Sequence, residues 1–422
     1  MRIVLKQVLI QHKASSYHDQ KVDIIIENGI ITSIDSNINI EADQVVSGNN
    51  LVCTIGLCDI GTHAGEPGFE YIETMDSLTI TALAGGYTML ALMPNLNPIT
   101  QTKSDVEYLK NHPDRNGVDI YPIGALSKDT KGHDINEYMD MKSAGITCFS
   151  DGLHSIMDTG LLMRSLLYAT HVDGVLVHFP GDENKVQDFD MHEGIMSTTL
   201  GLKGITDISE KSNLYRDHEV LKYTEGKILE HCLSSEGAIK LLKEFKSNTS
   251  NLNGSVAYLN LLFTEDVMSE FNTNYKVLPV LRSAKDKEAL QKAVIEENIK
   301  IIVSNHQPWD GESKNLEFSY AKFGAIGLQT CFPAVIDEFT GKAPLITVIE
   351  CFTIHPRNVL NVTLPNIELS QKANLCVIDL DKKWSFSEEN NTSKSKNSPL
   401  LGHEFNCKVM ATIHGEAAYF TT

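Results

Sequence analysis

The sequence predicts an α/β protein: a (β/α)8 barrel with a small β-sandwich domain formed by both chain ends. Two observations predict this class. Across residues 53–365, short apolar segments such as "TMLALMPN", "ITCFSDG" and "GVLVHFPG" alternate with segments of helical pattern, and repeated strand–helix units build parallel sheets. Residues 1–52 and 366–422 are instead rich in strand-like segments. We therefore expect the two chain ends to pair with each other beside the barrel.

The first expected element is a β-hairpin close to the N-terminus. The segment "KVDIIIENGIITSID", residues 21–35, holds two apolar runs joined across Asn28 and Gly29. An Asn-Gly pair between apolar runs is a strong signal for a two-residue hairpin turn. The barrel strands follow, and several end in a polar residue just before a loop. In a (β/α)8 barrel these strand ends carry the chemistry.

Strand-like segments return in the last part of the chain. "ANLCVIDLD" and "CKVMATIHGEAAYF" have the apolar character of strands, and the polar stretch "SFSEENNTSKSKNSP" lies between them. Clusters of Ser, Asn and Pro between regular segments are typical of loops. We expect this polar stretch to be an exposed loop.

The composition limits which binding partners and which cellular compartment are expected. The 422 residues carry a formal charge of −19 at pH 7, which disfavours nucleic acids and anionic membranes as partners. The eight cysteines form no C-x-x-C pair, as expected for buried thiols in a reducing compartment. Charges interrupt the apolar N-terminal stretch, and no run of about 18 apolar residues occurs. We expect a cytoplasmic, globular protein that forms a homo-oligomer.

A set of segments along the chain resembles the motifs of one family. These segments keep the family's order nearly from end to end: "GLCDIGTHAGEPGFE", "AGGYTMLALMPNLNP", "ITCFSDG", "HEGIMSTTLGLKGI", "YKVLPVLRSAKDKEAL", "KIIVSNHQPWDGESK", "FGAIGLQT" and "SKSKNSPLLG". The chain is similar to the bacterial dihydroorotases of the amidohydrolase superfamily, of the type found in multifunctional complexes. The resemblance implies an amidohydrolase-type barrel and a role in pyrimidine synthesis.

The family's reaction sets out what its site must contain. Dihydroorotase interconverts carbamoyl aspartate and dihydroorotate by closing and opening a cyclic amide. Zinc polarises the amide carbonyl and lowers the pKa of a bound water. A carboxylate carries the proton between water and the ring nitrogen. A guanidinium holds the substrate carboxylate through a two-pronged contact.

The resemblance places the family's first metal motif, a His-x-His pair, on the strand that ends near residue 63. Residues i and i+2 of a strand point to the same side. In this chain the first position of the pair is Gly61 and the second is His63, and the substrate-clamping arginine corresponds to Gly65. Glycine supplies neither a ligand atom nor a guanidinium. A binuclear zinc centre is therefore not expected.

Other positions implied by the resemblance are kept. Asp151 corresponds to a bridging aspartate, His178 to a further histidine ligand, and Asn95 to an asparagine that contacts the substrate. We take His63, Asp151 and His178 as the candidate ligands of one zinc ion, the alternative being that no metal is bound. Asn95 is taken as a residual substrate contact.

The later positions depart from the family. An ungapped alignment of "HCLSSEGAIKLL" puts Cys232 at the next histidine position, while His231 should face the other way if the strand is regular. Cys232 is a further candidate ligand, because thiolates bind zinc well. The catalytic aspartate is replaced by Asn305, which cannot take up a proton. Leu278 and Trp309 replace an asparagine and a substrate-facing histidine.

Two hypotheses of function follow. The first is a non-catalytic dihydroorotase homologue that acts as a scaffold or regulatory partner of aspartate carbamoyltransferase, the preceding enzyme of the pathway. The second is a weakly active or re-specialised metal-dependent cyclic amidohydrolase, acting on a cyclic amide C–N bond as dihydroorotase, hydantoinase or allantoinase does. General acid–base help alone is worth about 10²–10⁴ in rate, so the loss at position 305 favours the first hypothesis.

Overall fold

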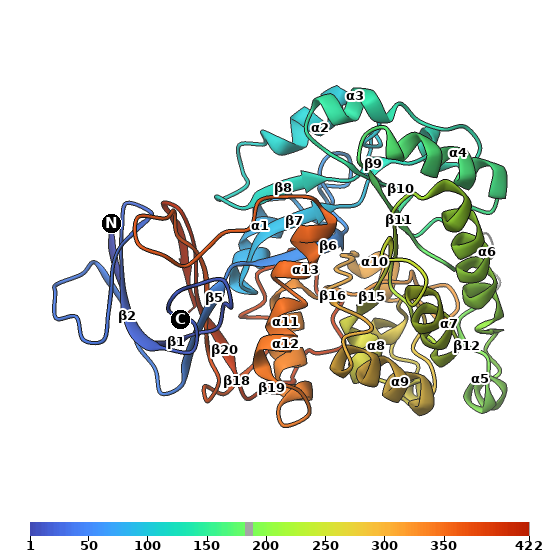
Figure 1. Cartoon of the computed structure of the whole chain (residues 1–422). Coiled ribbons are helices and arrows are strands. Elements are labelled where there is room, and N and C mark those ends of the chain that lie inside the picture. The colour runs from blue at the N-terminus through green and yellow to red at the C-terminus, as the bar shows by residue number, and fades with distance from the viewer. Residues whose placement is uncertain (182–188, 422) are drawn as a thin grey trace.

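A computed structural model describes residues 1–181 and 189–421 of the chain. Figure 1 shows a sheet built from both chain ends on one side and a barrel with its surrounding helices on the other. The predicted (β/α)8 barrel with a β-rich domain from both chain ends is confirmed. In the described residues, no helix combines the length and the apolar character needed to cross a membrane.

The terminal domain is one eight-stranded sheet with its own apolar core. The predicted hairpin is present: β2 and β3 pair in antiparallel fashion around Asn28 and Gly29, which both have positive φ. β5 pairs with β17, and Ile55 lies opposite Leu375, so the two chain ends join here. Since β5 reaches Ile55, this domain extends three residues beyond the predicted boundary at residue 52. The strands are β1 (Arg2–Ile10), β2 (Lys21–Glu27), β3 (Ile30–Asp35), β4 (Gln44–Val46), β5 (Leu51–Ile55), β17 (Asn374–Asp379), β20 (Lys408–His414) and β21 (Ala417–Phe420).

The barrel strands are parallel to their neighbours and follow one another in chain order. β8 and β9 are separated only by Ile123 and fill one position of the barrel between them. The backbone N–H of His63, just after β6, donates to the carbonyl of His306, beyond β16, at 2.9 Å. The first and last strands are thus neighbours at the mouth. The strands are β6 (Leu57–Thr62), β7 (Tyr87–Leu92), β8 (Asp119–Pro122), β9 (Gly124–Ala125), β10 (Cys148–Ser150), β11 (Val175–His178), β14 (Ile228–Glu230), β15 (Leu252–Ala257) and β16 (Ile301–Val303).

Helices separate the barrel strands and cover them from outside. They are α1 (Met75–Ala84), α2 (Lys103–Lys110), α3 (Tyr138–Ser143), α4 (Thr159–Thr170), α5 (Ile195–Leu200), α6 (Ile208–Thr224), α7 (Glu236–Lys246), α8 (Tyr258–Leu262), α9 (Ala284–Ile295), α10 (Gly311–Lys314), α11 (Leu328–Phe339), α12 (Leu345–Glu350) and α13 (Ile354–Val359). Short pairs of strands complete the chain: β12 (Met191–His192) with β13 (Gly204–Ile205), and β18 (Trp384–Ser385) with β19 (Glu404–Phe405). Several helices begin at a side-chain cap, as α1 does at Thr74, whose hydroxyl accepts from the N–H of Ser77.

Part of the polar stretch 385–399 is packed against the barrel, in contrast to the exposed loop predicted. The hydroxyl of Ser393 donates to the carboxylate of Glu73, and the hydroxyl of Ser395 donates to the carbonyl of Ile72. Asn397 donates to the carbonyl of Gln307. The intervening lysines remain exposed. Local composition indicated a loop correctly, but the buried carboxylate that receives this loop lies more than 300 residues away along the chain.

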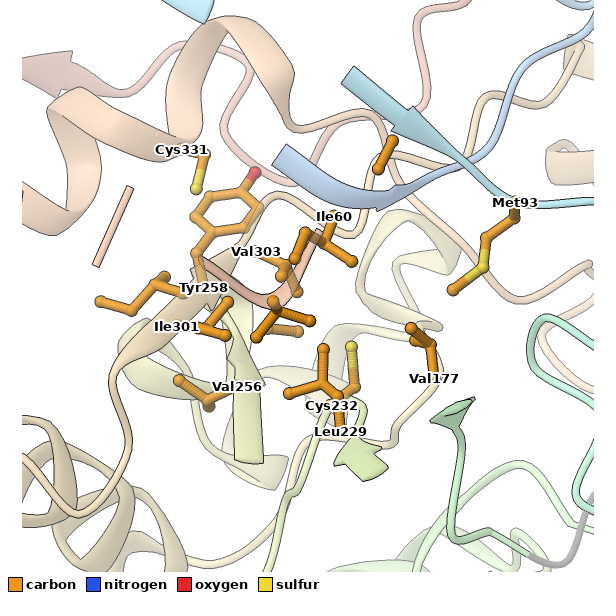
Figure 2. Close-up of a cluster of buried hydrophobic side chains, with 14 of the residues drawn as sticks. Ile60, Met93, Val177, Leu229, Cys232, Val256, Tyr258, Ile301, Val303 and Cys331 are labelled. Carbon is orange, nitrogen blue, oxygen red and sulfur yellow. The ribbon is translucent and has the colours of Figure 1, made fainter. Parts of the chain in front are cut away.

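The barrel interior is apolar, and this fixes which side chains face outward. Figure 2 shows Val177 of β11 and Leu229 of β14 in the interior cluster, together with Val256 and Ile301. Successive residues of a strand point to opposite faces. The next residues of β11 and β14 therefore point out of the barrel toward the helices. That alternation decides the position of one predicted ligand.

Candidate metal centre at the barrel mouth

His63 and Gly61 lie where β6 reaches the mouth of the barrel. His63 is partly buried, and its Nε2 is buried without a hydrogen-bond partner among residues 1–181 and 189–421. Burial, with the nearby His306 and His154, lowers the pKa of His63 to about 4. The imidazole is neutral at physiological pH and presents a free nitrogen. Gly61 has a φ of 92°, a conformation that favours glycine.

His231, rather than Cys232, meets His63 and Gly61 at the mouth. A Cβ added at Gly61 would lie 2.6 Å from the His231 ring. Burial and the nearby His63 lower the pKa of His231 to about 3. The alternation that points Leu229 inward and Glu230 outward also points His231 inward, and it breaks only at Cys232, which has a φ of 59°. The orientation predicted for His231 thus differs from the one in the structure.

Cys232 belongs to the apolar interior. Figure 2 shows it in the cluster with Leu229 and Val177, and it is almost fully buried. Burial raises the pKa of its thiol well above the ordinary value, which keeps it in the neutral form, whereas zinc binds the thiolate. The structure therefore gives Cys232 the environment of a core residue.

The side chains of Asp151 and Asn95 are engaged in hydrogen bonds within the protein and do not face a shared ligand site. Both carboxylate oxygens of Asp151 accept hydrogen bonds from Ser127, one from its N–H at 2.8 Å and one from its hydroxyl. Burial raises the pKa of Asp151 to about 6, although these bonds oppose the rise. Asn95 donates to the Asp151 carbonyl at 3.2 Å, and its Oδ1 fills the space a Cβ would take at Gly152. A side chain at position 152 therefore has no room.

His178 points out of the barrel, into a buried cluster with Asp217 of α6 and Glu230 of β14. Its Nδ1 lies 2.7 Å from Asp217 Oδ2 and 3.5 Å from Glu230 Oε2. Arg216 also contacts Asp217, at 2.6 Å. Burial and the neighbouring Asp217 raise the pKa of Glu230 to about 7. Among the described residues, these three form the one group of three or more ligand-type side chains whose donor atoms lie close enough together to hold a metal ion.

The proton on His178 argues against a metal in this cluster. The N–H of Ile156 donates to His178 Nε2 at 3.1 Å, so that nitrogen carries a lone pair. The ring proton then sits on Nδ1, between the two carboxylates. Burial lowers the pKa of His178, but the neighbouring Asp217 and Glu230 outweigh it and raise the pKa to about 9, while the Ile156 contact favours the neutral ring. A metal at Nδ1 would have to displace that proton and leave an imidazolate.

Asn305 stands at the position of the family's catalytic aspartate. Its amide donates to the carbonyl of Leu278 at 2.9 Å, while its Oδ1 is buried without a hydrogen-bond partner in the described part of the chain. The next residue, His306, lies 3.7 Å from Glu73 and accepts from the N–H of Gly327 at 3.1 Å. His306 thus ties the strand end to the loops around it. No proton-accepting carboxylate is available at position 305.

Gly65, at the substrate-clamp position, is enclosed by backbone. A Cβ there would lie 2.2 Å from the carbonyl oxygen of Glu73 and 2.7 Å from that of Phe69. The loop after β6 therefore has no room for an arginine.

Trp309 is held at a loop by its indole N–H, which donates to the carbonyl of Phe323 at 2.7 Å. Leu278 lines a cavity with Phe179 and Arg282 that has a volume of about 30 Å³, compared with about 300–1,000 Å³ for ligand pockets in general; Trp309 lines a different cavity, of about 440 Å³.

These positions do not fit a binuclear zinc centre. Gly61 has no donor atom, Asn305 is an amide, both Asp151 oxygens are engaged, and His178 faces outward. The predicted triad of His63, Asp151 and His178 is not brought together. What remains at the mouth is the pair of neutral imidazoles, His63 and His231, whose Nε2 atoms fit the lone-pair chemistry of a single ion. The sequence prediction placed Cys232, and not His231, at the mouth. Counting the strand alternation from the inward-facing Leu229 would have placed His231 there.

Solved structures similar to this one share its barrel and terminal sheet. An L-hydantoinase (dihydropyrimidinase) from Arthrobacter aurescens has a TM-score of 0.84 at 18% identity, covering 100% of this chain and 97% of that one. A dihydropyrimidinase from Brevibacillus agri has a TM-score of 0.81 at 14% identity, covering 99% and 95%. This chain thus has the same overall fold as these solved structures.

Sequence relatives define the family more closely. The family profile described as Dihydro-orotase-like matches residues 50–226. A dihydroorotase of Acetivibrio thermocellus is 31% identical over 395 residues, 93% of each chain. A dihydroorotase of Thermoanaerobacter sp. is 32% identical over 424 residues, 99% of this chain and 97% of the relative. The chain belongs to the dihydroorotase family, among the cyclic amidohydrolases.

Proposed function

We propose that this chain is a non-catalytic dihydroorotase homologue that acts by binding, as a scaffold or regulatory partner of aspartate carbamoyltransferase. The observation that carries the proposal is Asn305, an amide at the position of the catalytic carboxylate. General acid–base catalysis is worth about 10²–10⁴ in rate, and an amide cannot supply it. The amide is also committed to the Leu278 carbonyl.

The losses at the mouth reinforce one another. Gly65 supplies no guanidinium, and the surrounding backbone leaves no space for one. Residues that act as a unit in catalysis are strongly non-additive, so losing the base, the clamp and a metal ligand together removes the reaction as a whole. The barrel interior and the terminal sheet are meanwhile fully packed. A fold kept intact around a dismantled site is what a binding role requires.

The choice of partner rests on the family resemblance. This chain resembles inactive members of the family, which serve as scaffolds for aspartate carbamoyltransferase. The two proteins act in the same pathway, and the formal charge of −19 gives no reason to expect a nucleic acid instead. We also propose a cytoplasmic location and a homo-oligomeric state.

One observation favours the alternative, a weak or re-specialised metal-dependent cyclic amidohydrolase. His63 and His231 keep two neutral imidazoles at the mouth, and Asp151 has a raised pKa of about 6, in the range that suits a general base. Hydrogen bonds from Ser127 occupy both Asp151 oxygens, so this carboxylate is not free to accept a substrate proton. The scaffold proposal is therefore preferred.

Two measurements test the proposal. The first is closure of carbamoyl aspartate by the purified full chain with added Zn²⁺, beside a chelator-treated sample, with the Acetivibrio thermocellus relative as positive control. We expect no turnover above the chelated sample; zinc-dependent turnover of about 1–10³ per second would overturn the non-catalytic assignment. The second is gel filtration with aspartate carbamoyltransferase from the same organism, where co-elution is expected and separate elution contradicts the scaffold role.

A further inference from the structure

We propose that a polar cavity at the base of the barrel, on the side opposite to the mouth, binds a small phosphate monoester. The cavity has a volume of about 300 Å³, at the lower end of the range for ligand pockets in general. It lies under β11, β14, β15 and β16, at the ends where these strands begin. The six residues of β15, Leu252–Ala257, put about 17 Å between this cavity and the mouth, so binding here does not depend on turnover there.

The cavity is present because α13 closes only part of the barrel base. This helix contacts β6 (Figure 1), and the Cys148 thiol of β10 donates to the carbonyl of Val359, at the end of the helix, at 3.7 Å. On the other part of the base, the strands begin with polar side chains: Lys227 just before β14, Asn253 on β15 and Lys300 just before β16. A polar layer therefore lies below the apolar interior on this side.

The first support is a set of polar side chains that line the cavity and have no hydrogen-bond partner within residues 1–181 and 189–421. They are the amides of Asn253 and Asn358 and the ring of His355. Burial and the nearby Lys300 lower the pKa of His355, so its neutral ring offers one donor and one acceptor. The hydroxyl groups of a ligand both donate and accept, as amides and a neutral imidazole require.

The second support is the charge of the lining, which holds two lysines and one carboxylate in a chain of net charge −19. Lys227 lies 2.6 Å from one oxygen of Asp173, whose other oxygen accepts from Asn361 at 3.4 Å. Both oxygens of Asp173 are therefore engaged, while Lys227 keeps further N–H donors. Lys300 is paired with Glu297 at 3.6 Å, and both side chains are exposed. Such exposed pairs are weak, so a ligand anion can replace Glu297.

The types of donor favour a phosphate over a carboxylate. Among the described residues, no arginine lines the cavity, so the two-pronged guanidinium contact that matches a planar carboxylate is missing. Lysines are point charges with rotatable donors and are common phosphate ligands. Lys227 and Lys300 come from the strands on either side of β15, so they approach a tetrahedral group from different directions. The free amides and His355 then remain for hydroxyl groups of the same ligand.

Isothermal titration calorimetry of the full chain with glycerol 3-phosphate tests this, since that probe joins a phosphate monoester to hydroxyl groups. Glycerol, inorganic phosphate and malate are titrated beside it at equal ionic strength. We expect saturable binding of glycerol 3-phosphate with a Kd of about 1 mM or below, weaker binding of inorganic phosphate and malate, and no binding of glycerol. Because a ligand that binds only the folded state stabilises it, the Tm should rise over the same concentration range.

Matched variants locate the site. Lys300→Met removes the loosely paired charge and should weaken binding about 10–100-fold, whereas Asn253→Leu removes a neutral donor and should weaken it about 2–10-fold. Lys292→Met removes the same charge from an exposed position on α9 and should bind as the wild type does. Ser250→Trp, at an exposed residue of the lining, adds a ring that should block the cavity. Circular dichroism verifies that each variant is folded.

Several outcomes would overturn the inference. A wild type that shows no saturable binding of glycerol 3-phosphate leaves water as the occupant of the cavity. Equal binding by Lys300→Met, or by Ser250→Trp, places the ligand elsewhere. Glycerol or malate bound as tightly as glycerol 3-phosphate contradicts the phosphate class. None of these results bears on ring closure or on co-elution with aspartate carbamoyltransferase, which test the proposed function separately.

Discussion

Two groups of polar side chains, one on the outer face of the barrel wall and one at the barrel mouth, differ in whether their polar atoms have partners. The outer one, His178 with Asp217 and Glu230, combines opposite charges and a ring proton at contact distances of 2.7 and 3.5 Å. The inner one, His63 with His231, holds two neutral rings whose Nε2 atoms have no partner in the part of the chain that is described. Ligand-type residues are more numerous outside, but free lone pairs are found inside.

The difference teaches that residue type does not identify a metal site. The outer group is a mutually compensated charge cluster that joins α6 to the barrel wall, since Asp217 comes from the helix and the other two from strands. Removing one member leaves charges buried and unpaired, which is costly. In the inner pair, removing one ring removes a nitrogen that has no hydrogen-bond partner among the described residues. We therefore expect substitutions in the outer group to lower stability most, and substitutions in the inner pair to affect ligand binding most.

The largest effect is expected for Asp217→Asn in the outer cluster. It leaves His178 and Arg216 without their shared carboxylate in a buried site, which costs about 3–5 kcal/mol in the free energy of unfolding. Urea unfolding measures this. Glu219→Gln, an exposed carboxylate on the same helix, is the matched control and should stay within about 0.5 kcal/mol of the wild type. Equal losses in both variants would remove the distinction between cluster and surface.

The next effect is expected at Gly61. Gly61→Ala places a Cβ 2.6 Å from the His231 ring at a φ of 92°, and should destabilise the chain by about 2–3 kcal/mol from backbone strain and the clash together. Gly201→Ala, with a φ of 68° and nothing within 4 Å of the new Cβ, should cost only the strain, about 1 kcal/mol. Thermal or urea unfolding of both variants isolates the clash. A Gly61→Ala loss no larger than that of Gly201→Ala would show that the His231 ring does not fill this space.

A smaller effect, with opposite signs in the two groups, is expected from pH. The folded-state pKa of Glu230 is raised to about 7 from 4.5. The folded chain therefore binds more protons between these values, and its contribution to stability is lost as the pH rises through about 7. The pKa of His231 is lowered to about 3 from 6.5. There the unfolded chain binds more protons, and stability is lost as the pH falls below about 6.5.

Urea unfolding of chelated protein at about pH 5 and about pH 7 separates the two contributions. Relative to the wild type, Glu230→Gln should gain stability from the lower to the higher pH, and His231→Gln should gain it in the other direction, each by roughly 2 kcal/mol. Gains in the same direction would mean that the two groups do not differ in protonation as described.

The smallest effect is expected from an attempted repair at Asn305. Asn305→Asp removes the amide that donates to the Leu278 carbonyl at 2.9 Å and sets a carboxylate against that oxygen. We expect a loss of about 1–2 kcal/mol in stability and no ring closure of carbamoyl aspartate, because the clamp at Gly65 is still absent. Asn305→Ala, which loses the same hydrogen bond without adding a charge, is the control. Zinc-dependent turnover in Asn305→Asp alone would contradict the view that the site was lost as a unit.

The sequence by itself determined the architecture and the absence of functional groups at positions 61, 65 and 305. The alternation of apolar segments predicted the barrel, the Asn28–Gly29 pair predicted the hairpin, and the β-rich ends predicted a β domain shared by both chain ends. Local patterns suffice for these because backbone periodicity and turn conformation depend on neighbouring residues. Gly61, Gly65 and Asn305 likewise stand out from the sequence, since a missing functional group is missing in any fold.

Only the tertiary structure decided where the remaining groups point. His178 turns out of the barrel because Val177 before it packs into the interior, and Cys232 joins the interior beside His231 because its left-handed φ of 59° breaks the alternation there. Gly65 is closed by backbone of residues that follow it in a folded loop. Each of these depends on contacts between segments distant along the chain or on the residue at which a strand stops. A strand that stops one residue earlier or later exchanges the face of every side chain beyond it.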